Sequence, residues 1–257
     1  GEGAQITLRQ QRYLPAGSKG DPDGLWQIPV CLRWNDGQDQ EKCLLLAERE
    51  ASFSVEGCPQ WLLPNQRGAG YYRFSVEKEH FDNLASIGWP KLSDAERLVV
   101  LDSAIAEFWR GAIGPDVLSR LFAVAAQSKS QSIGAAPMEV LGFMRRHFFD
   151  REQRQQPWPL AAALYRPSMD RVGLLRQAKD DGEMVLLRAD VFAFLVDTAR
   201  DGKLRREASR MAQGLLAPKG LNLDKIDAGM ASTALLVALQ EQGQGYFDKL
   251  VQQLFAS

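Results

Sequence analysis

The chain has 257 residues, which is enough for one large domain or two smaller ones with a substantial core. Hydrophobic residues make up 45% and charged residues 25%, the ordinary composition of a soluble globular protein. The 31 basic and 32 acidic side chains almost cancel, which argues against a nucleic-acid partner, because such proteins concentrate an excess of positive charge. No apolar run approaches the roughly 20 residues of a membrane span, so none is expected.

Up to about Glu77 the hydrophobic pattern has a period of two, which is typical of strands that bury one face. The alternation is clearest over residues 26–34. Further strands are predicted at residues 6–8, 42–48, 52–55, 61–63 and 71–76. An Asn-Asp-Gly turn at residues 35–37 favours a hairpin between the second and third strands. These short strands predict a small antiparallel β-sandwich domain over residues 1–79.

Three cysteines are too few for a disulfide framework or a Cys-rich zinc site. Cys31 and Cys43 lie at equal distances from Gly37, so the predicted hairpin places them opposite each other. They are either a disulfide or two buried thiols in a reducing compartment. The second interpretation is favoured, because cysteine commonly behaves as a small buried hydrophobic residue.

From Phe81 onward the hydrophobic period becomes helical. Ser93 and Glu96 have the spacing of a capping box, and Gly111 lies where the helix that they open should end. Pro115 suits the first turn of the next helix. Later helices are predicted at residues 137–149, 169–178, 183–199, 203–216, 224–242 and 246–255. Short links favour antiparallel packing, so residues 80–257 are predicted to form a solenoid-like array of helical hairpins, in a protein that is mainly α.

No catalytic or metal-binding constellation is apparent. A His-Glu-x-x-His zinc site needs two histidines one helical turn apart, whereas His80 and His147 are far apart in the sequence. Phosphate-binding glycine loops and nucleophile elbows are also missing. We therefore assign no catalytic residue and no metal ligand, and leave the substrate-binding residues unknown.

Several charged or aromatic positions admit a functional interpretation beside a structural one. Arg188 and Arg210 either lie on solvated faces or line a concave helical surface and meet a carboxylate. The adjacent Asp180 and Asp181 are interpreted as a solvated helix cap rather than a catalytic pair. A sugar platform of tryptophans is disfavoured, because Trp26 and Trp34 share the predicted core face. Solvated faces are the default expectation for Arg145, Arg146, Lys203, Arg205 and Arg206.

Four strings over residues 5–104 resemble the aminopeptidase N family of gluzincin exopeptidases. Residues 6–14 resemble its Gln-x-Arg-Phe strand, with Tyr13 for Phe, and residues 23–30 its Trp-x-Ile-Pro strand. Residues 61–74 resemble its Asn…Gly-Tyr-Tyr-Arg element. Residues 92–104 resemble its Leu-Ser-x-x-Asp-Arg…Asp-Ala helix, with Glu96 where Asp is usual and Ser103 where Ala is.

The resemblance implies a non-catalytic C-terminal portion of a zinc metalloaminopeptidase. In that family a preceding catalytic domain holds the zinc and the general base, and the sandwich leads to a helical domain that covers the active site. The implied partners are the preceding catalytic domain of the same polypeptide and a peptide substrate. The implied cofactor, zinc, belongs to that parent domain, and none is expected in this chain.

The length of the helical domain and the function of the chain each have two interpretations. The family's helical domain generally continues beyond a segment such as residues 246–254, so this one is either truncated or naturally short. The alternative function is a free-standing scaffold that binds a peptide or protein on its helices. The sequence opens without a signal peptide, and its start resembles that of a domain, so we expect a soluble protein of either the cytoplasm or the periplasm.

Overall fold

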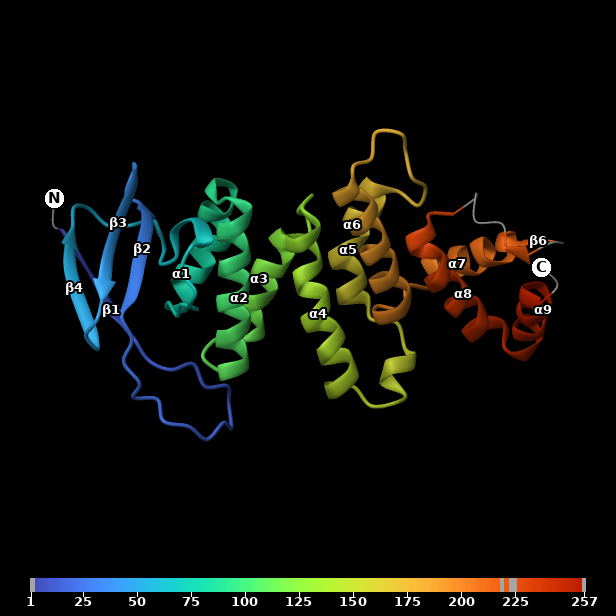
Figure 1. Cartoon of the computed structure of the whole chain (residues 1–257), viewed down its shortest axis with the longest axis horizontal. Helices are drawn as coiled ribbons and strands as arrows, with labels where there is room; N and C mark the ends of the chain where they lie inside the picture. Colours follow the sequence, from blue (N-terminus) through green and yellow to red (C-terminus); the bar gives the residue numbers. More distant parts are fainter. Residues whose placement is uncertain (1–2, 218–219, 222–225, 256–257) are drawn as a thin grey trace. The chain divides into compact units, whose positions relative to one another are not determined.

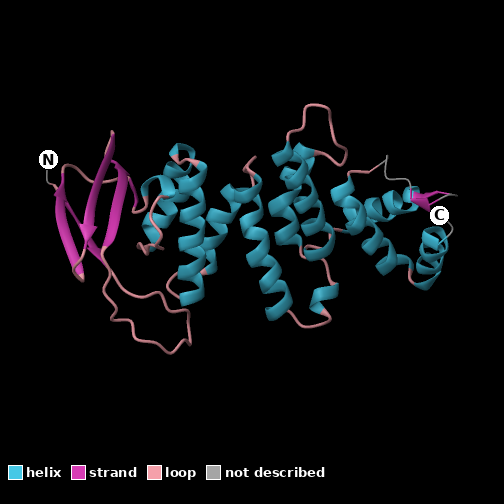
Figure 2. Ribbon diagram, in the orientation of Figure 1, coloured by secondary structure: helices cyan, strands magenta, loops and turns pink. Residues whose placement is uncertain are grey.

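The computed structural model describes residues 3–217, 220–221 and 226–255. The chain divides into two compact units, residues 1–124 and 125–257, and each is described by itself. Antiparallel strands at the N-terminal end are followed by helices, which confirms the predicted fold class (Figures 1 and 2). The predicted domain boundary at residues 79 and 80 falls inside the first unit and stays a prediction.

Five short strands form two antiparallel sheets in the first unit. β1 (Ala4–Arg9) pairs with β4 (Glu50–Val55), and β2 (Ile28–Asn35) lies between β3 (Asp39–Leu46) and β5 (Trp61–Leu63). Hydrophobic side chains from both sheets meet in one cluster, which makes the arrangement a small sandwich. The buried members are Ile6, Val30, Leu32, Trp34, Leu46 and Val55.

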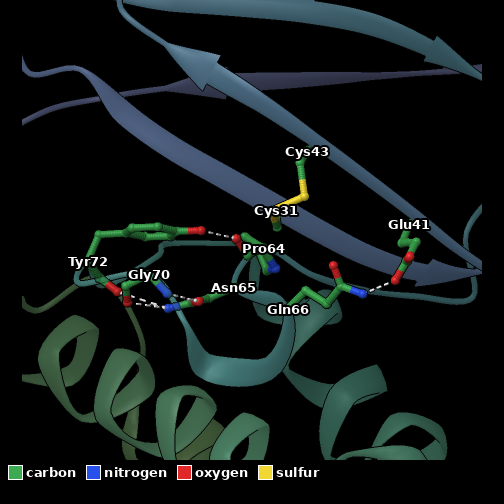
Figure 3. Close-up of a disulfide and its surroundings, with 8 residues drawn as sticks. All are labelled: Cys31, Glu41, Cys43, Pro64, Asn65, Gln66, Gly70 and Tyr72. Atoms are coloured by element: carbon green, nitrogen blue, oxygen red, sulfur yellow. Dashed lines mark hydrogen bonds between the residues drawn. A yellow bond between two sulfur atoms is a disulfide. The ribbon is translucent and has the colours of Figure 1, made fainter.

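The hairpin register was predicted correctly, but the favoured state of its cysteines was wrong. Cys31 and Cys43 are directly opposite each other in the β2–β3 ladder. Their Cα atoms lie 4.0 Å apart and their sulfur atoms are joined in a disulfide (Figure 3). Cys43 is exposed and Cys31 is only half-buried, so the two cysteines are not the buried thiols that were expected.

The strand predicted over residues 26–34 is present as β2, but its start and the core position of Trp26 were wrong, and so was the strand at residues 71–76. Trp26 precedes β2 and is 41% exposed, with the Arg12 guanidinium over its ring rather than the sandwich core. Residues 71–76 form no strand, because the Asn65 side chain takes the backbone partners that a neighbouring strand would need. Its amide group donates to the Gly70 carbonyl at 2.8 Å and accepts from the Gly70 N–H at 2.9 Å (Figure 3). The alternation itself persists, with Phe74 buried and Tyr71 fully exposed.

The helices of the first unit follow the predicted signals closely. α1 (Lys78–Asn83) and a π turn (Leu84–Gly88) precede α2 (Asp94–Arg110), and α3 (Pro115–Ala125) reaches the unit boundary. The capping box of α2 is confirmed: the Ser93 hydroxyl accepts from the Glu96 amide, and the Glu96 carboxylate accepts from the Ser93 amide at 2.8 Å. Gly111 ends α2 with a φ of 80°, which a side chain at that position would disfavour.

Helices also dominate the second unit, namely α4 (Gln131–Phe148), α5 (Pro159–Val172), α6 (Gly182–Ala193), α7 (Gly202–Leu215), α8 (Ala228–Gln242) and α9 (Gln244–Phe255). There α6 packs against α4, α5 and α8, and α8 packs against α7 and α9. Buried tyrosine hydroxyls join the helices: Tyr165 donates to the Gly134 carbonyl at 2.7 Å, and Tyr246 to the Ala212 carbonyl at 2.9 Å. Two short strands, β6 (Leu216–Ala217) and β7 (Gly220–Leu221), pair antiparallel directly after α7.

Prolines account for the two poorest helix predictions. The helix expected from Pro137 begins at Gln131, with Pro137 inside it. The helix expected over residues 169–178 instead spans Pro159–Val172, with Pro167 inside it. A proline removes one backbone hydrogen bond and usually marks a boundary, but burial of Ile133, Val140 and Tyr165 keeps both helices continuous. The predicted start at Asp224 lies outside the described residues.

Candidate functional site: a basic groove between α7 and α8

Neither histidine belongs to a cluster of metal-ligand type. His80 lies in α1, where its Nδ1 is buried without a hydrogen-bond partner. The ring of His147, in the last turn of α4, lies 4.2 Å from the ring of Phe143. Over residues 3–217, 220–221 and 226–255, no three His, Cys, Asp or Glu side chains are grouped as metal ligands. These residues do not fit a zinc ion, so we derive no chemical step through one.

The tryptophans do not form a platform for a sugar. Trp61 is fully buried beneath the Arg33 guanidinium, which lies 5.4 Å from its ring, and Trp34 is buried in the sandwich core. Trp26, by contrast, lies at the surface. A sugar-binding surface needs exposed rings side by side, and these three do not meet that condition.

Arg188 is an internal anchor rather than a ligand-facing side chain. Its side chain is 0% exposed and donates to the carbonyls of Val172 and Gly173, at the end of α5, and to the Asp180 carboxylate. The interpretation of Arg188 as a residue lining a concave surface is therefore wrong. The neighbouring Asp181 caps α6 by accepting from the Met184 amide, so the expected cap is confirmed at Asp181, whereas Asp180 is buried against Arg188.

Arg145 also departs from the default expectation of a solvated face. It is buried and donates to the carbonyls of Arg154 and Gln156, and its guanidinium lies over the rings of Phe149 and Trp158, at 5.0 and 5.6 Å. Burial lowers the pKa of Arg145, since removal from water disfavours the charged form. The residue therefore stabilises the loop after α4.

α7 supplies most of a basic groove of about 450 Å³. Asp201 caps the helix by accepting from the amides of Lys203 and Leu204, and Ala208 and Ala212 are fully buried on its inner side. Residues three and four apart share one edge of a helix, so the lining residues form a stripe along α7. They are Gly202, Arg205, Arg206, Ser209, Arg210 and Gln213, joined by Glu241 from α8.

The three arginines of this basic groove differ in their partners. Arg205 is buried and donates to the Glu241 carboxylate at 2.7 Å and to the Val196 carbonyl at 2.7 Å. Arg210, whose side chain is 71% exposed, forms an ion pair with Glu207 on its own helix. The Arg206 side chain is exposed and has no hydrogen bond or ion pair with any described residue. The basic groove therefore presents one guanidinium whose donors are available to a ligand.

Arg200, just before α7, is partly buried close to Arg205. The pKa of its guanidinium is lowered, first by burial and then by the positive charge of Arg205. Arg200 also adopts a left-handed backbone with a φ of 51°, which is uncommon for a residue with a side chain. The carboxylates of Glu241 and Asp197 act in the opposite direction and favour its charged form.

A second polar cluster, the polar joint, lies in the first unit around a cavity of about 310 Å³. Its buried Glu96 accepts from the amides of Ser93 and Arg67, and from Arg33 at 3.0 Å. Arg33 also donates to Asp39 at 2.8 Å. Burial opposes ionisation of Glu96, but these donors outweigh it and lower its pKa. The other lining residues are Glu41 and Gln66, which are hydrogen-bonded to each other (Figure 3).

Comparison with known families decides the assignment. The family model described as ERAP1-like C-terminal domain matches residues 61–257. The chain belongs to this family of gluzincin-aminopeptidase C-terminal domains. The match confirms the resemblance drawn from the sequence, and it extends from β5 to the end of the chain. No curated protein matches the chain significantly.

None of the described helices has the length and apolar character needed to cross a membrane.

Sequence reasoning named Arg205, Arg206 and Arg210 but did not bring them together, and it missed Ser209, Gln213 and Glu241. The spacing of Arg206 and Arg210, one helical turn apart, was the available signal. The contribution of Glu241 depends on how α8 packs on α7, which no local pattern reveals.

Proposed function

We propose that this chain is the non-catalytic C-terminal portion of a zinc aminopeptidase, which covers the active site of a preceding catalytic domain and encloses the peptide substrate. The observation that carries the proposal is the family match over most of the chain. In this proposal the catalytic domain of the same polypeptide supplies the zinc ion and performs the hydrolysis. The helical part supplies binding surface and excludes water from the bound peptide.

The basic groove gives this role a specific contact. A peptide carries a carboxylate at its C-terminus, and a guanidinium binds a carboxylate through two parallel N–H donors. The Arg206 side chain has no hydrogen bond or ion pair with a described residue, while Ser209 and Gln213, one and two turns along α7, are hydrogen-bonded to Gln242. The basic groove would therefore hold the carboxylate end of the peptide and orient the rest of the chain.

Two measurements on the purified chain test its division of labour with a catalytic domain. Elemental analysis should find zinc far below one equivalent, and an aminoacyl-amide substrate should remain uncleaved. Adding the catalytic domain encoded upstream should restore cleavage and change the preference for peptide length. Stoichiometric zinc together with cleavage by the chain alone would refute the proposal.

The reading frame upstream of Gly1 separates the proposal from the scaffold alternative. A His-Glu-x-x-His string upstream would make the chain part of an enzyme. A start codon immediately before this region would instead favour a free-standing scaffold that binds a peptide on its helices.

A further inference from the structure

The disulfide joins the edge strand of the three-stranded sheet to its neighbour. Within the described part of the chain β3 pairs with β2 alone, in the strand order β3-β2-β5. Cys31 and Cys43 are opposite each other near the middle of this ladder. An edge strand with one neighbour depends on that ladder and on its side chains to stay attached.

The turn-side half of β3 has almost no apolar anchor. The five residues from Asp39 to Cys43 are all exposed, whereas Leu46, at the opposite end of the strand, is buried in the sandwich core. Leu44 is only partly buried against that core. Apolar burial therefore holds one end of β3, and the end beyond the disulfide lacks this source of stability.

The weakly anchored end carries two contacts of the polar joint. Asp39 accepts from Arg33, which also binds Glu96 at the start of α2. Glu41 accepts from Gln66 in the segment after β5 (Figure 3). Both acidic residues lie between the disulfide and the hairpin turn. Because Arg33 belongs to β2, the Asp39 contact lies within the hairpin, and Glu41 is the residue of this pair that joins β3 to the segment before α2.

We propose that the Cys31–Cys43 disulfide is a redox-sensitive clamp that keeps the turn-side half of β3 attached to β2 and to the polar joint. Reduction requires a dithiol, which supplies two electrons and two protons. One thiolate of the dithiol attacks the exposed Cys43 sulfur, the Cys31–Cys43 bond breaks, and Cys31 leaves as a thiolate. The second thiol of the reductant then displaces Cys43. Cys31 and Cys43 end as thiols, and the reductant ends as a disulfide.

The consequence of reduction is local. The sandwich core lies on the other face of β2, through Val30, Leu32 and Trp34, and includes no cysteine. Loss of the clamp therefore frees the hairpin end, with its contacts to Gln66 and Arg33, while the core stays packed. The sandwich would keep its fold but lose the contact of Glu41 with Gln66, in the segment before α2.

Hydrogen exchange measured by mass spectrometry tests the clamp. A Cys58→Ser background removes the exposed free thiol, which gives a protein with only the two cysteines of the clamp. Dithiothreitol should speed amide exchange in residues 36–43 roughly tenfold or more, with a smaller rise in residues 64–68. Exchange in β1, β4 and residues 125–257 should not change. The double variant Cys31→Ser, Cys43→Ser should exchange like the reduced protein without any reductant.

Three results would overturn the proposal. Alkylation of both cysteines in protein purified without reductant, after denaturation, would show that the bridge does not form. Equal exchange in residues 36–43 with and without dithiothreitol would show that the bridge does not hold this segment. Loss of protection throughout the first unit on reduction would make the disulfide a general requirement for folding rather than a local clamp.

Discussion

The polar joint and the basic groove are both built around arginine, but they treat its charge differently. In the polar joint Arg33 meets Asp39 and Glu96, and the buried carboxylate of Glu96 receives two backbone donors as well. In the basic groove the Arg206 side chain has no hydrogen bond or ion pair with a described residue. A fully paired cluster stabilises the fold, whereas an unpaired guanidinium in a hollow is free to bind a ligand. Mutation of the polar joint should therefore lower the free energy of unfolding, whereas mutation of Arg206 should weaken ligand binding and leave the free energy of unfolding almost unchanged.

The same contrast exists between neighbours within the basic groove. Arg205 is buried and bound to α8 and to the Val196 carbonyl, while Arg206, the next residue, is exposed. Both line the basic groove, but consecutive residues on a helix point in directions about 100° apart, so Arg205 is buried while Arg206 is exposed to solvent. One arginine is structural and the other is available.

The largest effect should come from the polar joint. Glu96→Gln should lower the free energy of unfolding by about 3 kcal/mol, because it removes a buried carboxylate that Arg33 and two amides contact. Urea denaturation at neutral pH measures this loss. Asp94→Asn, on the same turn of α2 but with an exposed ion pair to Arg97, is the matched control and should cost under about 1 kcal/mol. Equal losses for both variants would remove the distinction that we draw.

Next in size is the difference between the two adjacent arginines. Arg205→Met should lower the free energy of unfolding by about 2 kcal/mol, since it leaves the Val196 carbonyl without a donor. Arg206→Met should change it by less than about 0.5 kcal/mol, as for other exposed positions. Thermal or urea unfolding of the pair checks both values. A comparable loss for Arg206→Met would mean that this residue has a structural partner.

The stability that Glu96 contributes should also depend on pH, and this effect is smaller. The folded-state pKa of Glu96 is lowered, so its ionised form contributes stability above the ordinary value of the unfolded chain, which is about 4.5. That contribution is lost as the pH falls through the lower folded-state pKa. The stability gap between the native protein and Glu96→Gln should therefore narrow from pH 7 toward pH 3. A gap that stays constant over this range would show that ionisation of Glu96 contributes nothing.

The smallest effect expected is on ligand-free stability at the rim of the basic groove. Arg210→Gln should change the free energy of unfolding by under about 0.5 kcal/mol, because its ion pair with Glu207 is exposed. The same substitution should weaken binding of a free-acid peptide less than Arg206→Gln does. Fluorescence anisotropy compares the two variants, and a larger loss for Arg210→Gln would move the binding role from Arg206 to Arg210.

Local signals predicted the parts of the fold that local chemistry determines. The capping box of Ser93 and Glu96 was readable because both bonds close within four residues. The opposition of Cys31 and Cys43 was readable because the turn at residues 35–37 sets the register. Whether the two sulfur atoms are bonded depends on oxidation, which the spacing does not encode.

Features that depend on distant partners were not predictable. Pro137 and Pro167 lie inside helices because tertiary burial outweighs the lost hydrogen bond. Arg205 and Arg206 are chemically identical in the sequence, and tertiary contacts to Glu241 and to the Val196 carbonyl distinguish Arg205 from its neighbour. The Asn65 side chain replaced a predicted strand by a turn through bonds to Gly70 that compete with sheet pairing. The family resemblance supplied the function, because no catalytic group in the sequence did.

The most direct measurement compares the binding of two fluorescent peptides to the purified chain, one with a free C-terminal carboxylate and one with a C-terminal amide. We expect the free acid to bind about tenfold more tightly than the amide, since a charge-assisted contact is worth about 1.5 kcal/mol. Arg206→Gln should abolish this difference, whereas Arg176→Gln, a change at an exposed arginine elsewhere in the second unit, should preserve it. Neither peptide should be cleaved. Equal affinity for the acid and the amide would contradict the proposed carboxylate contact at Arg206. Cleavage of either peptide by the chain alone would contradict its proposed non-catalytic role.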